Sequence, residues 1–168
     1  MKIEFPNALP CQAEVLSDLA IESKGHWGYS KEQLDIWRKD LKIEEEYITQ
    51  NLVRTILADG ELVGFYAIKK EKNEDVLDHL WLLSKAIGRG IGNHAFQKIK
   101  EDCTTLKIEE FAVISDLDAE GFYLKQGCVR VGEVESKPQN RMLPKLKYRI
   151  EETIQSQSTH TTPAVAPH

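Results

Sequence analysis

The fold is decided by one stretch, Val76-Leu77-Asp78-His79-Leu80-Trp81-Leu82-Leu83-Ser84-Lys85-Ala86-Ile87-Gly88-Arg89-Gly90-Ile91-Gly92-Asn93-His94-Ala95-Phe96. The mostly apolar run 76–83 has the length of a buried strand. From Ile91 onward, apolar residues recur every four positions, which predicts an amphipathic helix. That stripe consists of Ile91, Ala95, Ile99 and Cys103, widened by Phe96 and Leu106. The stretch therefore predicts a strand, a short loop and a long helix.

The loop between strand and helix carries glycine at three alternate positions, Gly88, Gly90 and Gly92. Glycine lets the backbone turn sharply and lets a ligand approach without a Cβ in the way. The unpaired N–H groups of the first helical turn favour an anion, above all a phosphate. Nearby positive charges or donors are supplied by Lys85, Arg89, His94 and Lys98. The sequence thus predicts a phosphate-bearing ligand at this loop. The alternative is a glycine-rich turn that binds no ligand.

Two common phosphate loops do not fit. A P-loop needs Lys-Ser/Thr after its last glycine, and Gly92 is followed by Asn93 and His94. A dinucleotide loop needs a third glycine three residues after the second, where this chain has Asn93. A third candidate remains.

The loop resembles the acetyl-coenzyme A loop of the GCN5-related N-acetyltransferase (GNAT) family. That motif, Arg/Gln-x-x-Gly-x-Gly/Ala, is matched by Ile87-Gly88-Arg89-Gly90-Ile91-Gly92, with Ile87 in place of Arg or Gln. A later stretch, residues 116–128, resembles a second motif of the same family. Ala119, Tyr123 and Gly127 fit it, whereas Asp116 replaces an Asn and Cys128 an aromatic residue.

The resemblance implies an α/β (α+β) fold: a mixed, mostly antiparallel sheet of six or seven strands, with helices on both faces and splayed central strands. It implies acetyl-coenzyme A as cofactor, held at the splay and at the glycine loop. The implied cofactor-binding positions are Leu82, Leu83, Ile87, Gly88, Arg89, Gly90, Ile91, Gly92, Asn93, Asp116, Ala119 and Tyr123. The Leu82 N–H is the expected donor to the thioester carbonyl.

Acetyl transfer to an amine also needs a base and benefits from an acid. The family resemblance puts the acid at Tyr123, although most helical tyrosines are only buried aromatics. The expected bases are Asp78 and His79. Because side chains alternate along a strand, we expect these two to point to opposite faces, so that at most one reaches the acceptor. The alternative is that both only hydrogen-bond across the sheet.

The acceptor pocket is expected at the turn that carries His26, Trp27 and Tyr29, since loops often carry function. The competing interpretation is that Trp27 and Tyr29 fasten the following helix to the core. That helix should begin at a capping box formed by Ser30 and Gln33.

The remaining pattern completes the expected order of elements. A short edge strand at 2–6 and a helix at 10–23, with Val15, Leu16, Leu19 and Ala20 on one face, precede the second helix, which carries Leu34, Ile36, Trp37 and Leu41. Strands are expected at 51–58, 61–70, 111–114, 129–135 and 143–150, with a hairpin turn at Asp59-Gly60, a short helix at 118–126 and a polar turn at 136–141. Pro144 predicts an edge or a bulge in the last strand.

The chain has 168 residues, which suggests one domain at 1–150, and the Ser, Thr, Gln and Pro-rich segment 151–168 reads as a disordered tail. A net charge of −5 argues against a general nucleic-acid binder. No apolar run in the sequence is long enough to predict a membrane-spanning helix. Three cysteines without a secretory signal favour the cytoplasm, and the histidines show no spacing for a metal site.

Three classes of function remain after this reading. The first is an acetyl-coenzyme A-dependent N-acetyltransferase acting on a small-molecule amine or an exposed protein or peptide amine. The second is a non-catalytic coenzyme A-binding relative with a sensor or regulatory role. The third is a different phosphate-ligand enzyme. No Gly-x-Ser-x-Gly sequence supports a serine nucleophile. A homodimer is left open.

Overall fold

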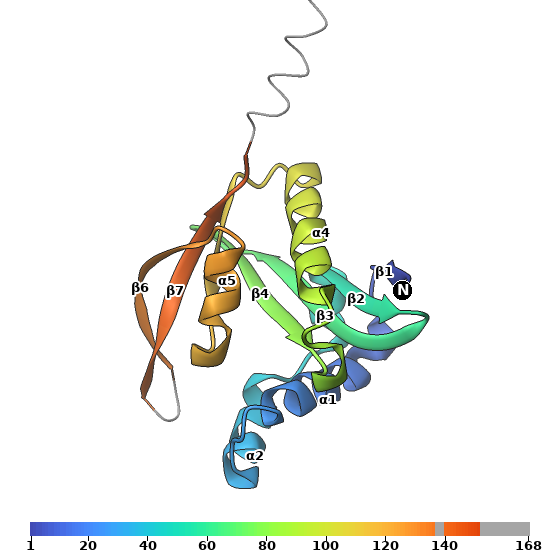
Figure 1. Cartoon of the computed structure of the whole chain (residues 1–168). Helices are drawn as coiled ribbons and strands as arrows, with labels where there is room; N and C mark the ends of the chain where they lie inside the picture. Colours follow the sequence, from blue (N-terminus) through green and yellow to red (C-terminus); the bar gives the residue numbers. More distant parts are fainter. Residues whose placement is uncertain (137–139, 152–168) are drawn as a thin grey trace, which may run out of the picture.

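The structure, a computed structural model, describes residues 1–136 and 140–151 and is built around one seven-stranded sheet (Figure 1). The strands lie in the order β1-β2-β3-β4-β5-β7-β6. Their bounds are β1 Ile3–Glu4, β2 Leu52–Ala58, β3 Glu61–Lys70, β4 Asp75–Leu82, β5 Glu110–Ile114, β6 Val129–Ser136 and β7 Arg141–Arg149. The α-helices are α1 Ala13–Gly25, α2 Lys31–Asp40, α3 Glu45–Gln50, α4 Ile91–Thr105 and α5 Glu120–Lys125, with short 3-10 helices at Pro10–Gln12, Ser84–Ala86 and Leu117–Ala119.

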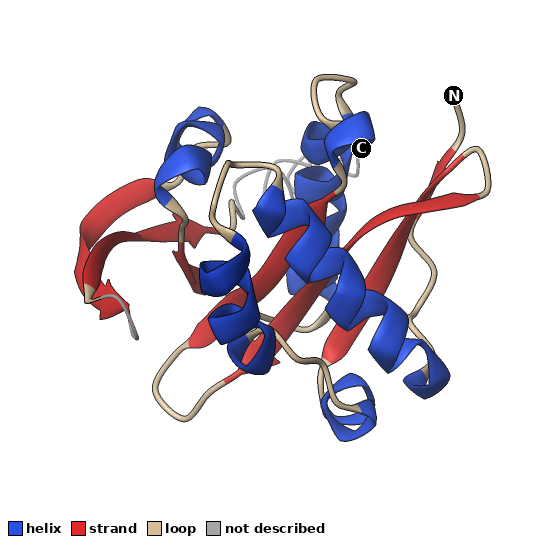
Figure 2. Ribbon diagram, turned by 90° about the horizontal axis from the view of Figure 1, so that it is seen from below, coloured by secondary structure: helices blue, strands red, loops and turns tan. Residues whose placement is uncertain are grey.

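The predicted splay is present between β4 and β5. All neighbouring strands pair antiparallel except these two, which run parallel and share only the pairs Asp75–Phe111 and Val76–Ala112. Beyond Val76 the two strands separate, and the β6–β7 pair diverges from the rest of the sheet (Figure 2). The predicted fold class, a mixed and mostly antiparallel sheet with splayed central strands, is confirmed.

Two apolar clusters cover the two faces of the sheet. On one face, α4 packs its stripe of Ile91, Ala95, Ile99 and Cys103, all fully buried, together with Tyr123 of α5. On the other face lie α1 and α3, represented by Leu16 and Ile48. Leu106 is 37% exposed, so the predicted widening of the α4 stripe at its end is wrong because the helix has already ended there.

A buried charge cluster joins α4 to the sheet. The Arg54 guanidinium donates to both carboxylate oxygens of Asp102 at 2.8 and 3.1 Å, and the Tyr66 hydroxyl donates to the same carboxylate. Asp102 is 4% exposed, and a buried carboxylate is tolerated only when it is paired and hydrogen-bonded. The cluster holds α4, and with it the glycine loop at its N-terminus, against β2 and β3.

The pattern in the first helices was partly misleading. Val15 on α1 and Ile36 on α2 are 48% exposed, whereas Leu16 and Trp37 are buried, so the core faces are narrower than predicted. The six-residue helix α3 was not predicted at all, because it is too short to show a helical period. The capping box of Ser30 and Gln33 is confirmed. The hairpin turn also forms, with Asp59 and Gly60 both at positive φ.

Of the two alternatives expected for Pro144, the edge is wrong, whereas a bulge does lie beside it: the β6–β7 register shifts between Arg130 and Gly132, opposite Leu146 and Lys145. The strand that carries Pro144, β7, lies inside the sheet between β5 and β6. The ladder with β5 ends at the Ile114–Lys145 pair, and the Ser115 N–H donates to the Pro144 carbonyl at 3.0 Å. Proline has no backbone N–H to donate. At Pro144 that missing donor lies beyond the end of β5, so no hydrogen bond of the β5–β7 ladder is lost.

Parts of two predictions lie outside the described residues: the centre of the polar turn, 137–139, and the tail from 152 onward. Across residues 1–136 and 140–151, no helix has the length and apolar character needed to cross a membrane. In that same part of the chain, no three His, Cys, Asp or Glu side chains gather as a metal site would require.

Candidate active site

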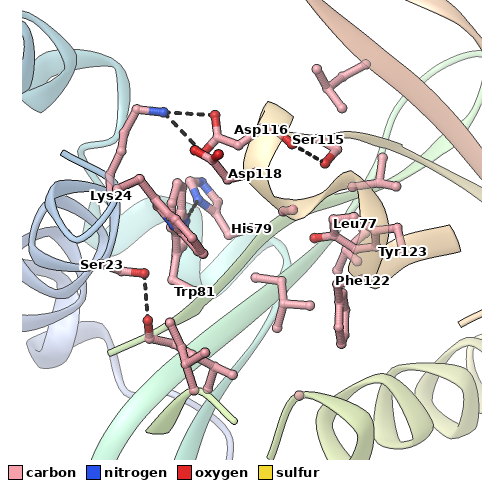
Figure 3. Close-up of a pocket in the computed structure, with 18 of the residues that line it drawn as sticks. Ser23, Lys24, Leu77, His79, Trp81, Ser115, Asp116, Asp118, Phe122 and Tyr123 are labelled. Atoms are coloured by element: carbon pink, nitrogen blue, oxygen red, sulfur yellow. Dashed lines mark hydrogen bonds and ion pairs between the residues drawn. The ribbon is translucent and has the colours of Figure 1, made fainter. Parts of the chain in front are cut away.

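A cavity of about 530 Å³ opens where β4 and β5 separate. This volume lies within the usual range for small-molecule and cofactor sites, roughly 300–1,000 Å³. Its walls come from β4, from the loop after β5, from α1 and α2, from α5 and from the glycine loop (Figure 3). The separation of β4 and β5 therefore creates a cavity large enough for a ligand, and does not only interrupt the hydrogen bonds between the two strands.

The glycine loop lies at one end of this cavity. Gly88 and Gly90 have φ values of 81° and 80°, and Gly90 is the N-cap of α4, so both need a residue that tolerates left-handed backbone. A Cβ at either position would meet no atom of the protein within 4 Å. The loop is open toward solvent. It leads directly into α4, a 15-residue helix, so the first N–H groups of that helix lie at the end of the loop. This geometry suits a phosphate group.

The other predicted loop positions divide into two groups. Ile87, Gly88, Gly90, Gly92 and Asn93 line the cavity. Arg89 turns away, donating to the Lys85 carbonyl at 3.4 Å, and Ile91 is buried in the core, so only its backbone remains for a ligand. Gly92 has a packing reason as well, because a Cβ there would lie 3.0 Å from the Phe122 ring.

Leu82 and Leu83 differ in what their backbone offers. The Leu83 N–H donates to the Val63 carbonyl at 2.8 Å, and its own carbonyl accepts from the Ala86 N–H at 2.8 Å. Because alternate residues of a strand point their backbone groups to opposite edges, the Leu82 groups face away from β3. The Leu82 carbonyl accepts from the Ser23 hydroxyl at 2.7 Å. The Leu83 N–H is therefore not free for a ligand, while the Leu82 N–H faces the splay.

Asp116 is occupied by an ion pair that sequence reasoning missed. Lys24 Nζ lies 3.0 and 3.3 Å from its two carboxylate oxygens, and the Lys24 and Asp116 side chains are only 8% and 15% exposed. Arg141 approaches the same carboxylate at 3.9 Å. Asp116 is the N-cap residue of the short helix Leu117–Ala119, but its carboxylate makes no capping bond. Ala119 lies beside it on the cavity wall.

Aromatic rings surround the Lys24 ammonium. The ring centres of Trp37, Tyr29 and Trp81 lie 4.2, 5.3 and 5.8 Å from Nζ. Such cation–π contacts stabilise a desolvated charge in addition to its ion pair. Lys24 thus joins α1, α2, β4 and the end of β5 at the end of the cavity away from the glycine loop.

Tyr123 lies on α5 with its ring in the cavity wall, on the opposite side from Lys24 and Trp81 (Figure 3). It is 6% exposed, and burial raises the pKa of its phenol. Among the described residues, none hydrogen-bonds to its hydroxyl. Helix α5 ends at Lys125, and Gly127, two residues later, has φ 101° and lets the Cys128 N–H reach the Tyr123 carbonyl at 3.0 Å.

Asp78 and His79 lie together, which contradicts the expectation of opposite faces. Ala67 pairs with His79 and Ile68 with Leu77, so Asp78 is the extra residue of a β-bulge. The bulge brings Asp78 Oδ2 within 3.7 Å of His79 Nε2, and both residues line the cavity. Strand alternation failed here because a register shift depends on the partner strand, which the pattern of β4 alone does not contain.

The predicted acceptor turn reaches the cavity through one residue only. Trp27 lines it and is 42% exposed, whereas His26 packs edge-on against Trp27 at 4.9 Å between ring centres. Tyr29 packs edge-on against Trp37 at 4.7 Å, and its hydroxyl accepts from Arg141 at 3.2 Å. For Tyr29, these contacts favour the alternative interpretation, in which its side chain packs against α2 and holds that helix in place.

Several cavity residues were not predicted, namely Ser23, Lys24, Trp37, Asp40, Trp81 and Phe122. One of them carried a signal. Lys24 follows Leu16 and Ala20 at intervals of four, so a lysine continues the buried stripe of α1. A charged side chain on an apolar face needs a partner, and that requirement points to a site.

Comparisons with known proteins agree with this geometry. A family model described as "Acetyltransferase (GNAT) domain" matches residues 28–149. A search of curated protein sequences found no significant match. Among solved structures, the PaiA N-acetyltransferase of Thermoplasma acidophilum in complex with coenzyme A has a TM-score of 0.70 at 21% identity, covering 88% of this chain and 100% of that one.

Two further structures are similar in the same way. A GCN5-related N-acetyltransferase of Rhodopseudomonas palustris has a TM-score of 0.70 at 18% identity, covering 88% of this chain and 94% of the other. An acetyltransferase of Thermus thermophilus has 0.64 at 18% identity, covering 89% and 97%. These likenesses support the fold, and the family model supports membership. A glycine loop at the start of α4, facing a splay after Val76, is what the family motif predicted, and with the family model over 28–149 it shows that the chain belongs to the GNAT acetyltransferase family.

Proposed function

We propose that this protein is an acetyl-coenzyme A-dependent N-acetyltransferase that moves the acetyl group directly to the amine of a small molecule or to an exposed protein or peptide amine. Acetyl-coenzyme A is the cofactor of GNAT domains. The observation that carries the proposal is the single cavity that joins the glycine loop, the splay and the Tyr123 ring. A cofactor that spans these features would have its thioester beside Tyr123.

The glycine loop supplies the cofactor's anchor in this proposal. The pyrophosphate binds to the N–H groups of residues 88–93, where Gly88 and Gly90 leave room for it. The pantetheine arm lies in the splay, and the Leu82 N–H stabilises the negative charge that develops on the thioester oxygen. The acceptor enters from the opposite end, past Trp27 and the pair of Asp78 and His79.

Tyr123 protonates the leaving thiolate. Burial raises its pKa, so that the hydroxyl keeps its proton at neutral pH, and no described side chain competes for that hydrogen bond. General acid catalysis of this kind contributes roughly 10²–10⁴-fold to a rate. The alternative of a non-catalytic coenzyme A sensor shares the cavity but needs no proton donor at this point.

The test is Tyr123→Phe, which keeps the ring and removes only the hydroxyl. We expect cofactor affinity and the free energy of unfolding to change little, and kcat on the best acceptor from an amine screen to fall by roughly 10²–10⁴-fold. Phe122→Leu, next in the chain, is the packing control and should not show this selective loss of kcat. A Tyr123→Phe variant that turns over like the wild type, with chemistry rate-limiting, would remove Tyr123 from the mechanism.

A wild-type protein that binds coenzyme A but acetylates no amine in the screen would favour the sensor instead. Calorimetry with coenzyme A and a thiol-release assay over monoamines, polyamines, amino acids and peptides separate the two outcomes.

A further inference from the structure

We propose that Asp78 is the base that receives the amine proton, and that Trp81 holds His79 in the tautomer in which it cannot be that base. This inference rests on the proposed acetyl transfer and assigns separate roles to two residues that the sequence alone left as equal candidates. It adds Trp81 and Tyr47 to the site as positioning residues. The argument depends on three contacts around the β4 bulge.

The first contact fixes the histidine ring. The Trp81 indole N–H donates to His79 Nδ1 at 2.9 Å. An indole nitrogen is only a donor, so Nδ1 must carry its lone pair, and in the neutral ring the proton lies on Nε2. The Nε2–H then faces Asp78 Oδ2 at 3.7 Å. In this state His79 has no free lone pair for an incoming amine.

The surroundings of His79 keep the ring neutral. Burial lowers its pKa, and the Lys69 charge lowers it further, while Asp78 acts in the opposite direction. The side chain is 11% exposed and lies between the Phe65 and Tyr47 rings, at 5.7 and 5.8 Å between centres. Three titratable or charged groups of the described residues face the His79 ring: Asp78 on the same strand, Tyr47 from α3 and Lys69 from β3.

The second and third contacts orient Asp78. The Tyr47 hydroxyl donates to Asp78 Oδ2 at 2.5 Å, and burial together with that carboxylate raises the pKa of Tyr47, so that it stays a donor. The same oxygen faces His79 Nε2. Both neighbours thus meet Oδ2, and Oδ1 remains for a ligand. The Asp78 side chain is 35% exposed and lines the cavity, so an acceptor can reach it.

The proton balance of the step follows from these roles. The amine lone pair forms the C–N bond with the thioester carbon, and the C–S bond breaks as the carbonyl re-forms. The nitrogen becomes strongly acidic once its lone pair is in the new bond, so a carboxylate suffices to take its proton. That proton goes to Asp78, the thiolate takes one from Tyr123, and solvent returns the Asp78 proton to Tyr123. The products are the amide and the free thiol.

The tautomer is tested without any acceptor or turnover. Long-range ¹H–¹⁵N NMR on ¹⁵N-histidine-labelled protein, assigned with a His79→Gln sample, reports which ring nitrogen carries the proton. We expect a neutral ring with the proton on Nε2 at pH 7, and a mixture of tautomers in Trp81→Phe, which lacks the indole donor. A doubly protonated ring at pH 7, or a proton on Nδ1, would overturn the inference even if acetyl transfer were never found.

The base is tested by kinetics on the best acceptor. Asp78→Asn should lower kcat by roughly 10²–10⁴-fold. His79→Gln keeps a side-chain N–H, so it should lower kcat by less than about tenfold, and Tyr47→Phe should lower kcat more than it changes KM. Glu45→Gln, an equal charge change on the exposed surface of α3, is the control.

The opposite ranking would assign the base to His79. If His79→Gln lowers kcat by roughly 10²–10⁴-fold and Asp78→Asn keeps a rate within about threefold of the wild type, Asp78 is not the proton acceptor. Cofactor affinity, measured for each variant by calorimetry, separates these results from misfolding. Because acetyl transfer would continue in that case, the inference would fail while the proposed function stood.

Discussion

The proposed cofactor end and the proposed acceptor end of the cavity are built from different parts of the polypeptide. At the glycine loop the chain presents backbone N–H groups, and Gly88 and Gly90 contribute the absence of a side chain. At the other end, Lys24, Trp37 and Asp116 contribute side chains from three elements that are distant in sequence. Because a backbone site needs only local conformation, whereas a side-chain site needs packing, changes at the two ends should have different consequences.

The largest effect is expected for stability at the acceptor end. Lys24→Met keeps the length of the side chain but leaves Asp116 buried without its main partner, and breaking a buried pair typically costs about 3–5 kcal/mol. Arg141, at 3.9 Å, compensates in part, so we expect the lower end of this range in urea unfolding. The double variant Lys24→Met/Asp116→Asn should recover much of the loss. A single variant as stable as the wild type would show that this end is not held by its ion pair.

At the cofactor end, affinity should change more than stability. Gly90→Val forces a branched residue into φ 80° and puts a side chain at the proposed phosphate site, so coenzyme A affinity should fall at least about tenfold, or about 1.4 kcal/mol. Gly60→Val is a matched control, since Gly60 has φ 82° and equally open surroundings but lies in the β2–β3 turn. Calorimetry on both variants separates backbone strain from blocked binding. Equal affinities would contradict the assignment of the phosphate site.

The pH dependence of stability tests the burial of His79. Its pKa is lowered in the folded state, so between that value and the unfolded value near 6.5 the unfolded chain binds more protons. Stability is therefore present above about pH 6.5 and is lost as the pH falls, by up to about 1.4 kcal/mol per pH unit from this group. His79→Gln should remove that part of the slope in urea unfolding between pH 7.5 and 5.5. Parallel curves for the two proteins would show an ordinary, solvated histidine.

The smallest effect is expected at Trp27, which is half exposed at the mouth of the cavity. Trp27→Ala should change acceptor KM several-fold, by about 1 kcal/mol, and leave coenzyme A affinity alone. Trp37→Ala is the contrasting variant, since Trp37 is 4% exposed and its loss should cost about 3–5 kcal/mol of stability. If Trp27→Ala unfolds the protein as Trp37→Ala does, Trp27 fastens the turn and does not contact the acceptor.

The sequence predicted well wherever a feature is local. The strand, glycine loop and helix of residues 76–105 form as expected, because hydrophobic period and glycine placement act on neighbours in the chain. The capping box of α2 and the turn at Asp59-Gly60 succeeded for the same reason. The errors at Val15 and Pro144 arose where the answer depends on which other element packs alongside.

In the candidate site, the same division holds. The cofactor loop and Tyr123 were found from motif spacing, and they line one cavity. Lys24 and Trp37 were missed, since their partners lie on other elements and the residues next to them in the sequence do not indicate which partners those are. Asp78 and His79 were found but placed on opposite faces, because the bulge is a property of the β3–β4 register.

By itself, the sequence determined the family, the order of the strands and of the helices other than α3, and the glycine loop that would hold a phosphate, since each of these depends on residues that are neighbours in the chain. Only the tertiary structure decided which side chains meet at the acceptor end, and that Asp78 and His79 share one face. The physical reason is that contacts between distant elements are selected by the packing of the whole core and by strand register, and a local pattern contains neither.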